Sequence, residues 1–144
     1  MAKIAPMASI VGIFTSPGRK TAQADPHERR QAVAGVGLEG CAHANPPKRE
    51  VLFVSKEHLD AVGVEPGAIR ENITVQGDDV EQWPIGQRVR AGDAEFEITM
   101  VCDPCHRMDE LRQGLRAELQ GRRGMLARVT QSGEIAVGDE ITLV

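Results

Sequence analysis

The chain has 144 residues, of which 41% are hydrophobic and 26% are charged, as in an ordinary globular protein. This length predicts one domain over residues 1–144. The net charge of −4 and the aromatic content of 3% argue against a nucleic-acid binder, which needs positive surface and stacking rings. No apolar run is long enough to cross a bilayer. With three cysteines and no apolar leader, we expect a cytoplasmic protein without a membrane partner.

The first third of the chain contains one clear strand and a glycine-rich turn. Residues 8–16 alternate as an opening strand should, and the polar residues 18–31 predict an exposed loop. Residues 33–40 include three glycines, which permit either close approach of a ligand to the backbone or a tight barrel corner.

The middle of the chain alternates short strands with turns. Residues 50–55 predict a buried strand, and Ser55 is placed to begin a short helix that ends near Gly63. Residues 71–76 predict another strand, and residues 87–90 follow a loop and predict the next one.

The last third contains the longest strand and the longest helix. Residues 95–101 alternate over their whole length, and residues 107–119 predict a single helix. Residues 125–130 and 140–144 predict two closing strands, with a turn at 131–134. About seven strands with two helices indicate a mostly β protein, either a barrel or a compact sheet.

The segment Cys102-Asp103-Pro104-Cys105-His106 lies between a predicted strand and a predicted helix. The Cys-x-x-Cys spacing is found in dithiol redox sites, and with the following histidine it is also found in c-type haem attachment sites. Too few residues follow Cys105 to complete a thioredoxin-like fold, and haem attachment belongs to exported proteins. Two further interpretations remain open: small buried cysteines without chemistry, and a metal site.

A zinc site would combine Cys41 and His43 with Cys102 and Cys105. The first pair has one intervening residue, fewer than structural zinc pairs usually have. Arginines are frequent after the Cys-x-x-Cys and suit either a small anionic ligand or a solvated helix face. They are Arg112, Arg116, Arg122, Arg123 and Arg128.

Several short segments then stand in a characteristic order. They are Gly37-Leu38-Glu39-Gly40 with His43, Arg70-Glu71-Asn72, Pro84-Ile85-Gly86, Pro104-Cys105, and Arg123-Gly124 through Gly138-Asp139 to Ile141. This order resembles the MOSC domain, the family named after the C-terminal domain of molybdenum-cofactor sulfurase. The resemblance extends over about residues 10–141. It implies a small stand-alone member, folded as a β-barrel with two to three peripheral helices.

The resemblance also implies a function in molybdenum chemistry. Such a protein binds the molybdenum cofactor (molybdopterin) or carries sulfur, and some relatives support the reduction of N-hydroxylated compounds. Cys105 matches the signature cysteine, which acts as persulfide carrier or as molybdenum ligand. The implied partners are the pterin cofactor and either a cysteine desulfurase or a molybdenum enzyme, with no pyridoxal phosphate site of its own.

By the same resemblance Arg70, Asn72, His43 and Arg123 are expected to face the cofactor. A soft thiolate suits molybdenum or sulfane sulfur, and an arginine fork suits a pterin phosphate. Plainer roles stay open: a surface ion pair for Arg70, a turn cap for Asn72 and a structural hydrogen bond for His43.

The chain departs from the family pattern at one place. It reads Gly40-Cys41-Ala42-His43 where members usually read Gly-Asp-Arg-His, so one acidic and one basic group are missing. Two other functions therefore stay open. The chain could be a non-catalytic binding module on the same barrel, or a thiol-redox protein that uses Cys102 and Cys105.

Overall fold

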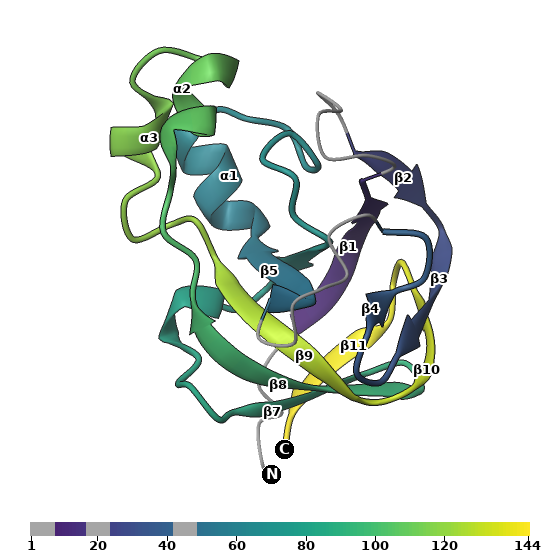
Figure 1. The fold of residues 1–144 in the computed structure, drawn as a ribbon. Helices are drawn as coiled ribbons and strands as arrows, with labels where there is room; N and C mark the ends of the chain where they lie inside the picture. The colour runs from purple at the N-terminus through teal and green to yellow at the C-terminus, as the bar shows by residue number, and fades with distance from the viewer. Residues whose placement is uncertain (1–7, 17–23, 42–48) are drawn as a thin grey trace, which may run out of the picture.

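The structure, a computed structural model, describes residues 8–16, 24–41 and 49–144. Within these residues seven strands close into a barrel, because β1 pairs with β6 on one side and with β11 on the other. Their order around the barrel is β11 (Glu140–Leu143), β7 (Arg88–Ala91), β8 (Ala94–Val101), β9 (Met125–Gln131), β5 (Val51–Ser55), β6 (Ile73–Gln76) and β1 (Ala8–Thr15). The expectation of a mostly β barrel with peripheral helices is confirmed (Figure 1).

Neighbouring barrel strands run antiparallel except β5 and β6. A parallel pair needs a crossover connection, and helix α1 (Lys56–Val62) lies within it. The helix begins after Ser55 and ends at Gly63 in the left-handed conformation, as the sequence predicted. The hydroxyl of Ser55 does not cap the helix but donates to the carbonyl of Asp78 at 2.9 Å.

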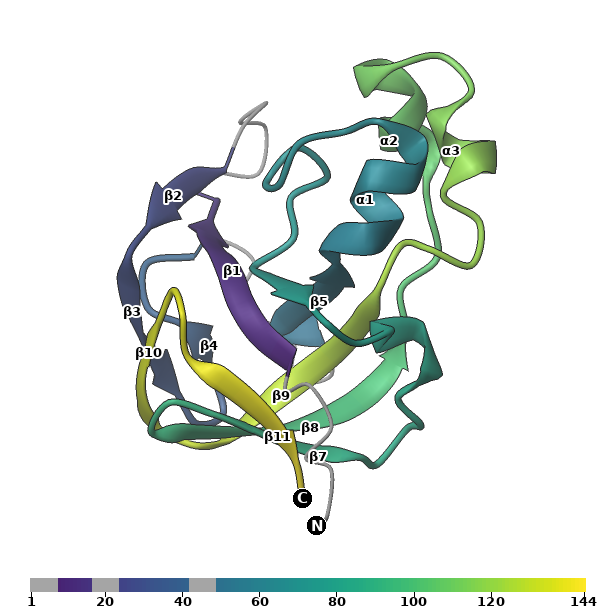
Figure 2. The same cartoon turned by 180° about the vertical axis from the view of Figure 1, so that it is seen from behind.

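The three α-helices found in the described residues lie at one end of the barrel, and the C-terminus lies at the opposite end (Figures 1 and 2). The predicted helix over 107–119 is two short helices, α2 (His106–Leu111) and α3 (Leu115–Glu118). The prediction of one helix is wrong because Arg112 has extended angles and Gly114 has a φ of 88°. No helix among the described residues is both long and apolar enough to cross a membrane.

The predicted loop over 18–31 is also wrong for its described part. β2 (Asp25–His27) pairs with β1, and β3 (Arg29–Val33) pairs with β4 (Gly37–Leu38) and β10 (Gly133–Ala136). β2 and β3 are polar because all of their residues except Ala32 are exposed or only partly buried, so the sequence lacks a clear apolar alternation there. In Figure 1 these strands lie on the right side of the molecule, and α2 and α3 lie at its upper left.

Two apolar clusters hold the fold together. The barrel interior contains the fully buried Phe53, whose ring meets the edges of Phe96 and Trp83 at centroid distances of 5.2 and 5.8 Å. The second cluster lies under the helices, where Leu59, Met108 and neighbouring apolar residues pack together. This second cluster anchors the helical end of the barrel, where the sequence placed the candidate site.

Candidate functional site

Cys105 lies immediately before α2, and its carbonyl oxygen accepts the amide of Met108 at 3.0 Å. Its thiol belongs to an exposed residue, whereas Cys41 and Cys102 are buried. Met108 is 2% exposed and fastens the helix to the second apolar cluster. The fold therefore presents one of the three cysteines to solvent on an anchored segment.

Cys102 lies on the other side of the same segment. Residues 102–105 belong to no helix, strand or turn, and burial alternates from buried Cys102 to exposed Cys105, whose backbone is extended. The thiol of Cys102 thus lies inside the protein and that of Cys105 belongs to the surface, although the charge of Cys105 still contributes to raising the pKa of Cys102. Burial raises the pKa of the Cys102 thiol, and the nearby charge of Arg123 only partly opposes this rise.

Arg123 and Gly124 lie between the turn that ends at Arg122 and the start of β9. Gly124 has a φ of 104°, and a Cβ atom there would overlap the carbonyl oxygen of Phe53. Its amide donates to the carboxylate of Glu81, and its carbonyl accepts the amide of Cys102 at 3.0 Å. Arg123 is 8% exposed, and its Nε and Nη1 atoms are buried without a hydrogen-bond partner in the described part of the chain.

Arg70 lies in the connection between α1 and β6. Its φ of 66° is in the left-handed region, which a side chain other than glycine or asparagine seldom adopts. Burial, together with the positive charge of Arg107, lowers the pKa of its guanidinium. Arg107 follows Cys105 by two residues, so α2 brings this second cation close to Arg70.

Glu71 is a fully buried carboxylate that the sequence analysis did not single out. Its Oε2 accepts the amide of Gly67 and the hydroxyl of Thr74, both at 2.7 Å. Its Oε1 has no hydrogen-bond partner among the described residues. Burial raises the pKa of Glu71, and the hydrogen bonds and the positive charge of Arg123 oppose that rise.

Asn72 joins three segments through its side-chain amide. Its Oδ1 accepts the amide of Leu52 at 2.9 Å, and its Nδ2 donates to the carbonyl of Phe14 at 3.1 Å and to the thiol of Cys41 at 3.4 Å. The amide is therefore engaged in holding β5, β1 and Cys41 together. Its predicted contact with a cofactor stays a prediction.

The structure thus brings Arg70, Asn72 and Cys41 together, and it places Arg123 near Glu71 and Cys102. His43 lies outside the described residues. Among the residues that are described, no group of three or more histidine, cysteine or acidic side chains is arranged to hold a metal ion.

A surface hollow of about 400 Å³ lies elsewhere on the molecule. It is lined by Gly35, Glu50, Arg128, Val129 and Thr130. Arg128 is one of the arginines that suited an anionic ligand, and Gly35 belongs to the glycine-rich segment 33–40, but none of the residues expected to face the cofactor lines this hollow. The residues that sequence reasoning missed near the site are Glu71, Glu81 and Arg107. Nothing in the local sequence indicates that Glu71 or Glu81 is withdrawn from solvent. Only Arg107 could have been found from the sequence, because it lies two residues after Cys105.

Comparison with known proteins agrees with this architecture. The YUAD protein of Bacillus subtilis has a similar structure, with a TM-score of 0.82, 20% sequence identity and coverage of 94% of each chain. YiiM of Geobacillus stearothermophilus has a TM-score of 0.78 at 21% identity, covering 95% of this chain and 75% of that one. YiiM of Escherichia coli has a TM-score of 0.77 at 21% identity, covering 96% and 70%. At such identities these likenesses establish the fold alone.

No curated protein matches this sequence significantly. The sequence does match the family described as the MOSC domain, over residues 41–142. This match spans more than two-thirds of the chain and includes Arg70, Asn72, Cys105 and Arg123. The closed barrel and the family match lead to the same conclusion: the chain belongs to the MOSC domain family.

Proposed function

We propose that this MOSC-type protein uses Cys105 to carry sulfur or to ligate the molybdenum of a pterin cofactor. The observation that supports this most directly is the exposure of Cys105, while Cys41 and Cys102 are buried. A thiol must be reachable to accept sulfur from another protein or to bind a metal. The three free cysteines suit the reducing conditions of the cytoplasm.

Sulfur transfer to Cys105 needs only the thiolate and a persulfide donor. The thiolate sulfur attacks the outer sulfur of a persulfide held by a cysteine desulfurase, and a new S–S bond forms at Cys105. The S–S bond in the donor breaks, and the donor cysteine leaves as a thiolate. The accepted sulfur then lies at an exposed position, from which a molybdenum enzyme or its cofactor could take it.

Two arginines suit the anionic end of a pterin cofactor. The buried guanidinium of Arg123 has two nitrogens without a hydrogen-bond partner in the described chain, as a site prepared for an anion would have. Arg70 adds a second guanidinium, and its strained backbone is of the kind that clusters at ligand sites. When bound, the cofactor would supply molybdenum redox chemistry, which includes the reduction of N-hydroxylated compounds.

The test begins with protein isolated from cells that make the cofactor. Intact-mass spectrometry should find one added sulfur on Cys105, or metal and pterin analysis should find the cofactor in stoichiometric amount. Incubation with a cysteine desulfurase and cysteine should load sulfur onto the wild type. The Cys105→Ser variant should gain none, and Cys102→Ser is the matched control that should still load. Protein that acquires neither sulfur nor cofactor contradicts the proposal.

A non-catalytic binding module is the second candidate, because the chain carries Cys41-Ala42 where the family has an acidic and a basic residue. The thiol of Cys41 is buried and accepts a hydrogen bond from Asn72. It therefore serves local structure. Cofactor binding without sulfur loading or reductase activity would favour this candidate.

A dithiol redox function is less well supported. The thiol of Cys102 is buried and Cys105 is exposed, so a disulfide between them would require one of the two side chains to leave its present environment. The raised pKa of Cys102 also leaves less thiolate at neutral pH for exchange.

A further inference from the structure

The surface hollow of about 400 Å³ has walls that the fold itself positions. Gly35 belongs to the turn between β3 and β4, and its amide donates to the carbonyl of Val129 in β9 at 3.2 Å. Glu50 directly precedes β5 and accepts the amide of the same Val129 at 2.9 Å. Val129 thus fastens both the turn and Glu50 to β9. The volume is within the range of small-molecule sites in proteins.

The carboxylate of Glu50 is the buried polar group of this hollow. Glu50 is 1% exposed, and the amide of Val129, which reaches Oε1, is the one hydrogen-bond donor that the described chain gives it. A carboxylate offers about four acceptor positions, and burial is costly unless they are used or the charge is paired. Burial raises the pKa of Glu50, although the amide of Val129 and the charge of Arg128 oppose this rise. Glu50 therefore has acceptor capacity for a donor that enters the hollow.

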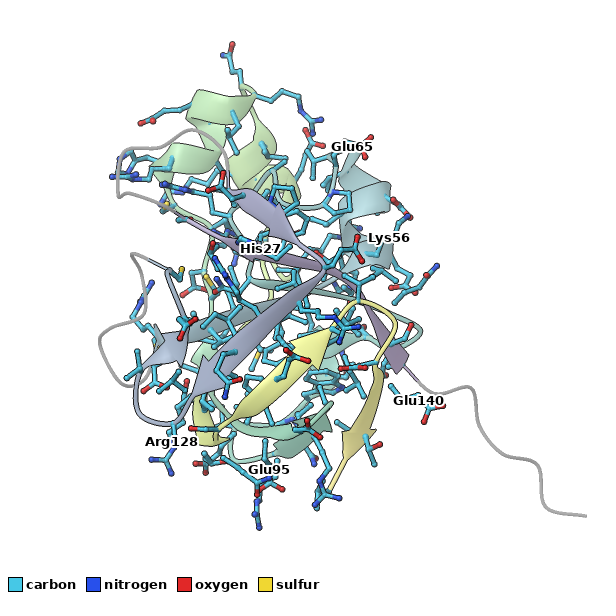
Figure 3. All side chains as sticks on the ribbon, turned by 90° about the vertical axis from the view of Figure 1, so that its right-hand side faces the viewer. His27, Lys56, Glu65, Glu95, Arg128 and Glu140 are labelled. Carbon is cyan, nitrogen blue, oxygen red and sulfur yellow. The ribbon has the colours of Figure 1, made fainter. Side chains whose placement is uncertain are left out.

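The guanidinium of Arg128 is the positive group of the same hollow. Its side chain is 53% exposed, and Figure 3 shows it reaching outward at the lower left of the molecule. Its Nε and Nη2 lie 2.7 and 2.5 Å from Oε1 of Glu97, so its ion-pair partner is Glu97 and not Glu50. A guanidinium has more N–H donors than this pair uses, so Arg128 can also donate to an acceptor in the hollow.

A negative group at the base and a positive group at the rim fit a ligand that carries both charges. An ammonium group would donate to Glu50, and a carboxylate would accept from Arg128. A polyamine fits less well because Arg128 would repel its second charge, and Glu50 would repel a dianion in the same way. We propose that this hollow binds a free α-amino acid as its zwitterion, with Glu50 on the ammonium group and Arg128 on the carboxylate.

This binding site is separate from the one under Proposed function. Cys105, Arg70 and Arg123 do not line the hollow. Amino-acid binding therefore does not depend on whether Cys105 carries sulfur. The alternative role for Glu50 is structural, since its carboxylate holds the backbone of β9 at Val129. A glutamine at this position has an oxygen that can accept the same amide, so it separates the charge from the structural contact.

The test begins with calorimetric titration of the full chain with each standard amino acid. The amino acid that binds best is then compared with its amide, which lacks the carboxylate, and with its N-acetyl derivative, which lacks the ammonium group. Each derivative should bind about 10-fold to 100-fold more weakly, because each loses a charge-assisted hydrogen bond.

Three variants assign the two ends of the ligand. Glu50→Gln should weaken amino-acid binding about 10-fold to 100-fold while the circular dichroism spectrum stays unchanged. Arg128→Gln should weaken binding of the amino acid and leave binding of its amide nearly unchanged. Glu134→Gln is the control, since this exposed glutamate pairs with Arg29 away from the hollow, and it should change binding less than about twofold.

Selective weakening in Glu50→Gln and Arg128→Gln supports the site. The proposal is overturned if no amino acid binds to the wild type, or if Glu50→Gln and Glu134→Gln have equal effects. It is also overturned if either derivative binds as tightly as the free amino acid, because the ligand then needs only one charge. If Glu50→Gln fails to fold, Arg128→Gln at its exposed position still decides through the comparison of amino acid and amide. Sulfur loading of Cys105, measured in parallel, reports separately on the proposed function.

Discussion

The side-chain amide of Asn72 donates to the thiol of Cys41 across 3.4 Å and joins the glycine-rich turn to the barrel wall. The same amide bonds Leu52 in β5 and the carbonyl of Phe14 in β1. Residues far apart in the sequence are thus held together by the single side-chain amide of Asn72, which also fixes the thiol of Cys41. The surroundings of Asn72, Gly124, Glu71 and Cys105 each predict a measurable outcome.

Asn72→Ala should lower the free energy of unfolding by about 3 kcal/mol, because it leaves the buried groups that Asn72 pairs without partners. Urea denaturation monitored by circular dichroism measures this loss. Gln76→Ala, at the exposed end of β6, the strand that follows Asn72, should change the free energy by less than about 0.5 kcal/mol. Equal effects of the two substitutions would show that the amide of Asn72 does not hold the strands.

Gly124→Ala should destabilise the protein by about 3 kcal/mol or more, since its Cβ would overlap the carbonyl of Phe53 and its φ is 104°. Gly121→Ala is the matched control, with a φ of 77° and no atom within 4 Å of the added Cβ. Strain alone should cost this control about 1 kcal/mol. A thermal or urea unfolding series separates the two. Similar losses would mean that the close contact with Phe53 relaxes.

Glu71→Gln should become more stable relative to the wild type as the pH rises. The folded protein raises the pKa of Glu71, so the wild type keeps its full stability below the unfolded pKa and loses part of it as the pH rises through the folded pKa. Glutamine accepts the hydrogen bonds from Gly67 and Thr74 without a charge. Urea unfolding of both proteins from about pH 4 to pH 8 measures the difference. If the stability of Glu71→Gln relative to the wild type stays constant or falls as the pH rises, the pKa of Glu71 is not raised in the folded protein.

Cys105 should react with a maleimide much faster than the other two cysteines in the native protein, since it alone of the three is exposed. Intact-mass spectrometry should find one label at early times and none in Cys105→Ser. Mild oxidation should join two chains through Cys105 and should not produce a bond to Cys102 within one chain. A fast intramolecular disulfide would show that residues 102–105 rearrange easily, and it would revive the dithiol hypothesis.

Much of the barrel was predictable from apolar alternation. The strands at β1, β5, β8 and β9 and the helix after Ser55 follow from local pattern, since one buried face fixes their period. The strands β2 and β3 were not predictable, because their polar side chains are stabilised by pairing with β1 and β10. The break at Gly114 was also missed, since a single glycine is compatible with a continuous helix.

The candidate site was predictable only in part. The spacing around Cys105 and the order of motifs indicated Arg70 and Arg123, and the structure places both at partly or fully buried positions. Glu71 was missed because a glutamate beside Asn72 gives no local sign that the folded barrel buries it. Local sequence also does not report the lack of a hydrogen-bond partner at Glu71 Oε1.

Barrel closure couples the two ends of the described chain, because Ala8 lies opposite Ile141 in the pairing of β1 with β11. Residue 141 must therefore be synthesised before the pairing of β1 with β11 can form. Until then β1 has an unpaired edge that could pair with another chain. Contacts of such long sequence separation also slow folding. A chaperone that shields β1 during synthesis should therefore improve the yield more than one that acts after release.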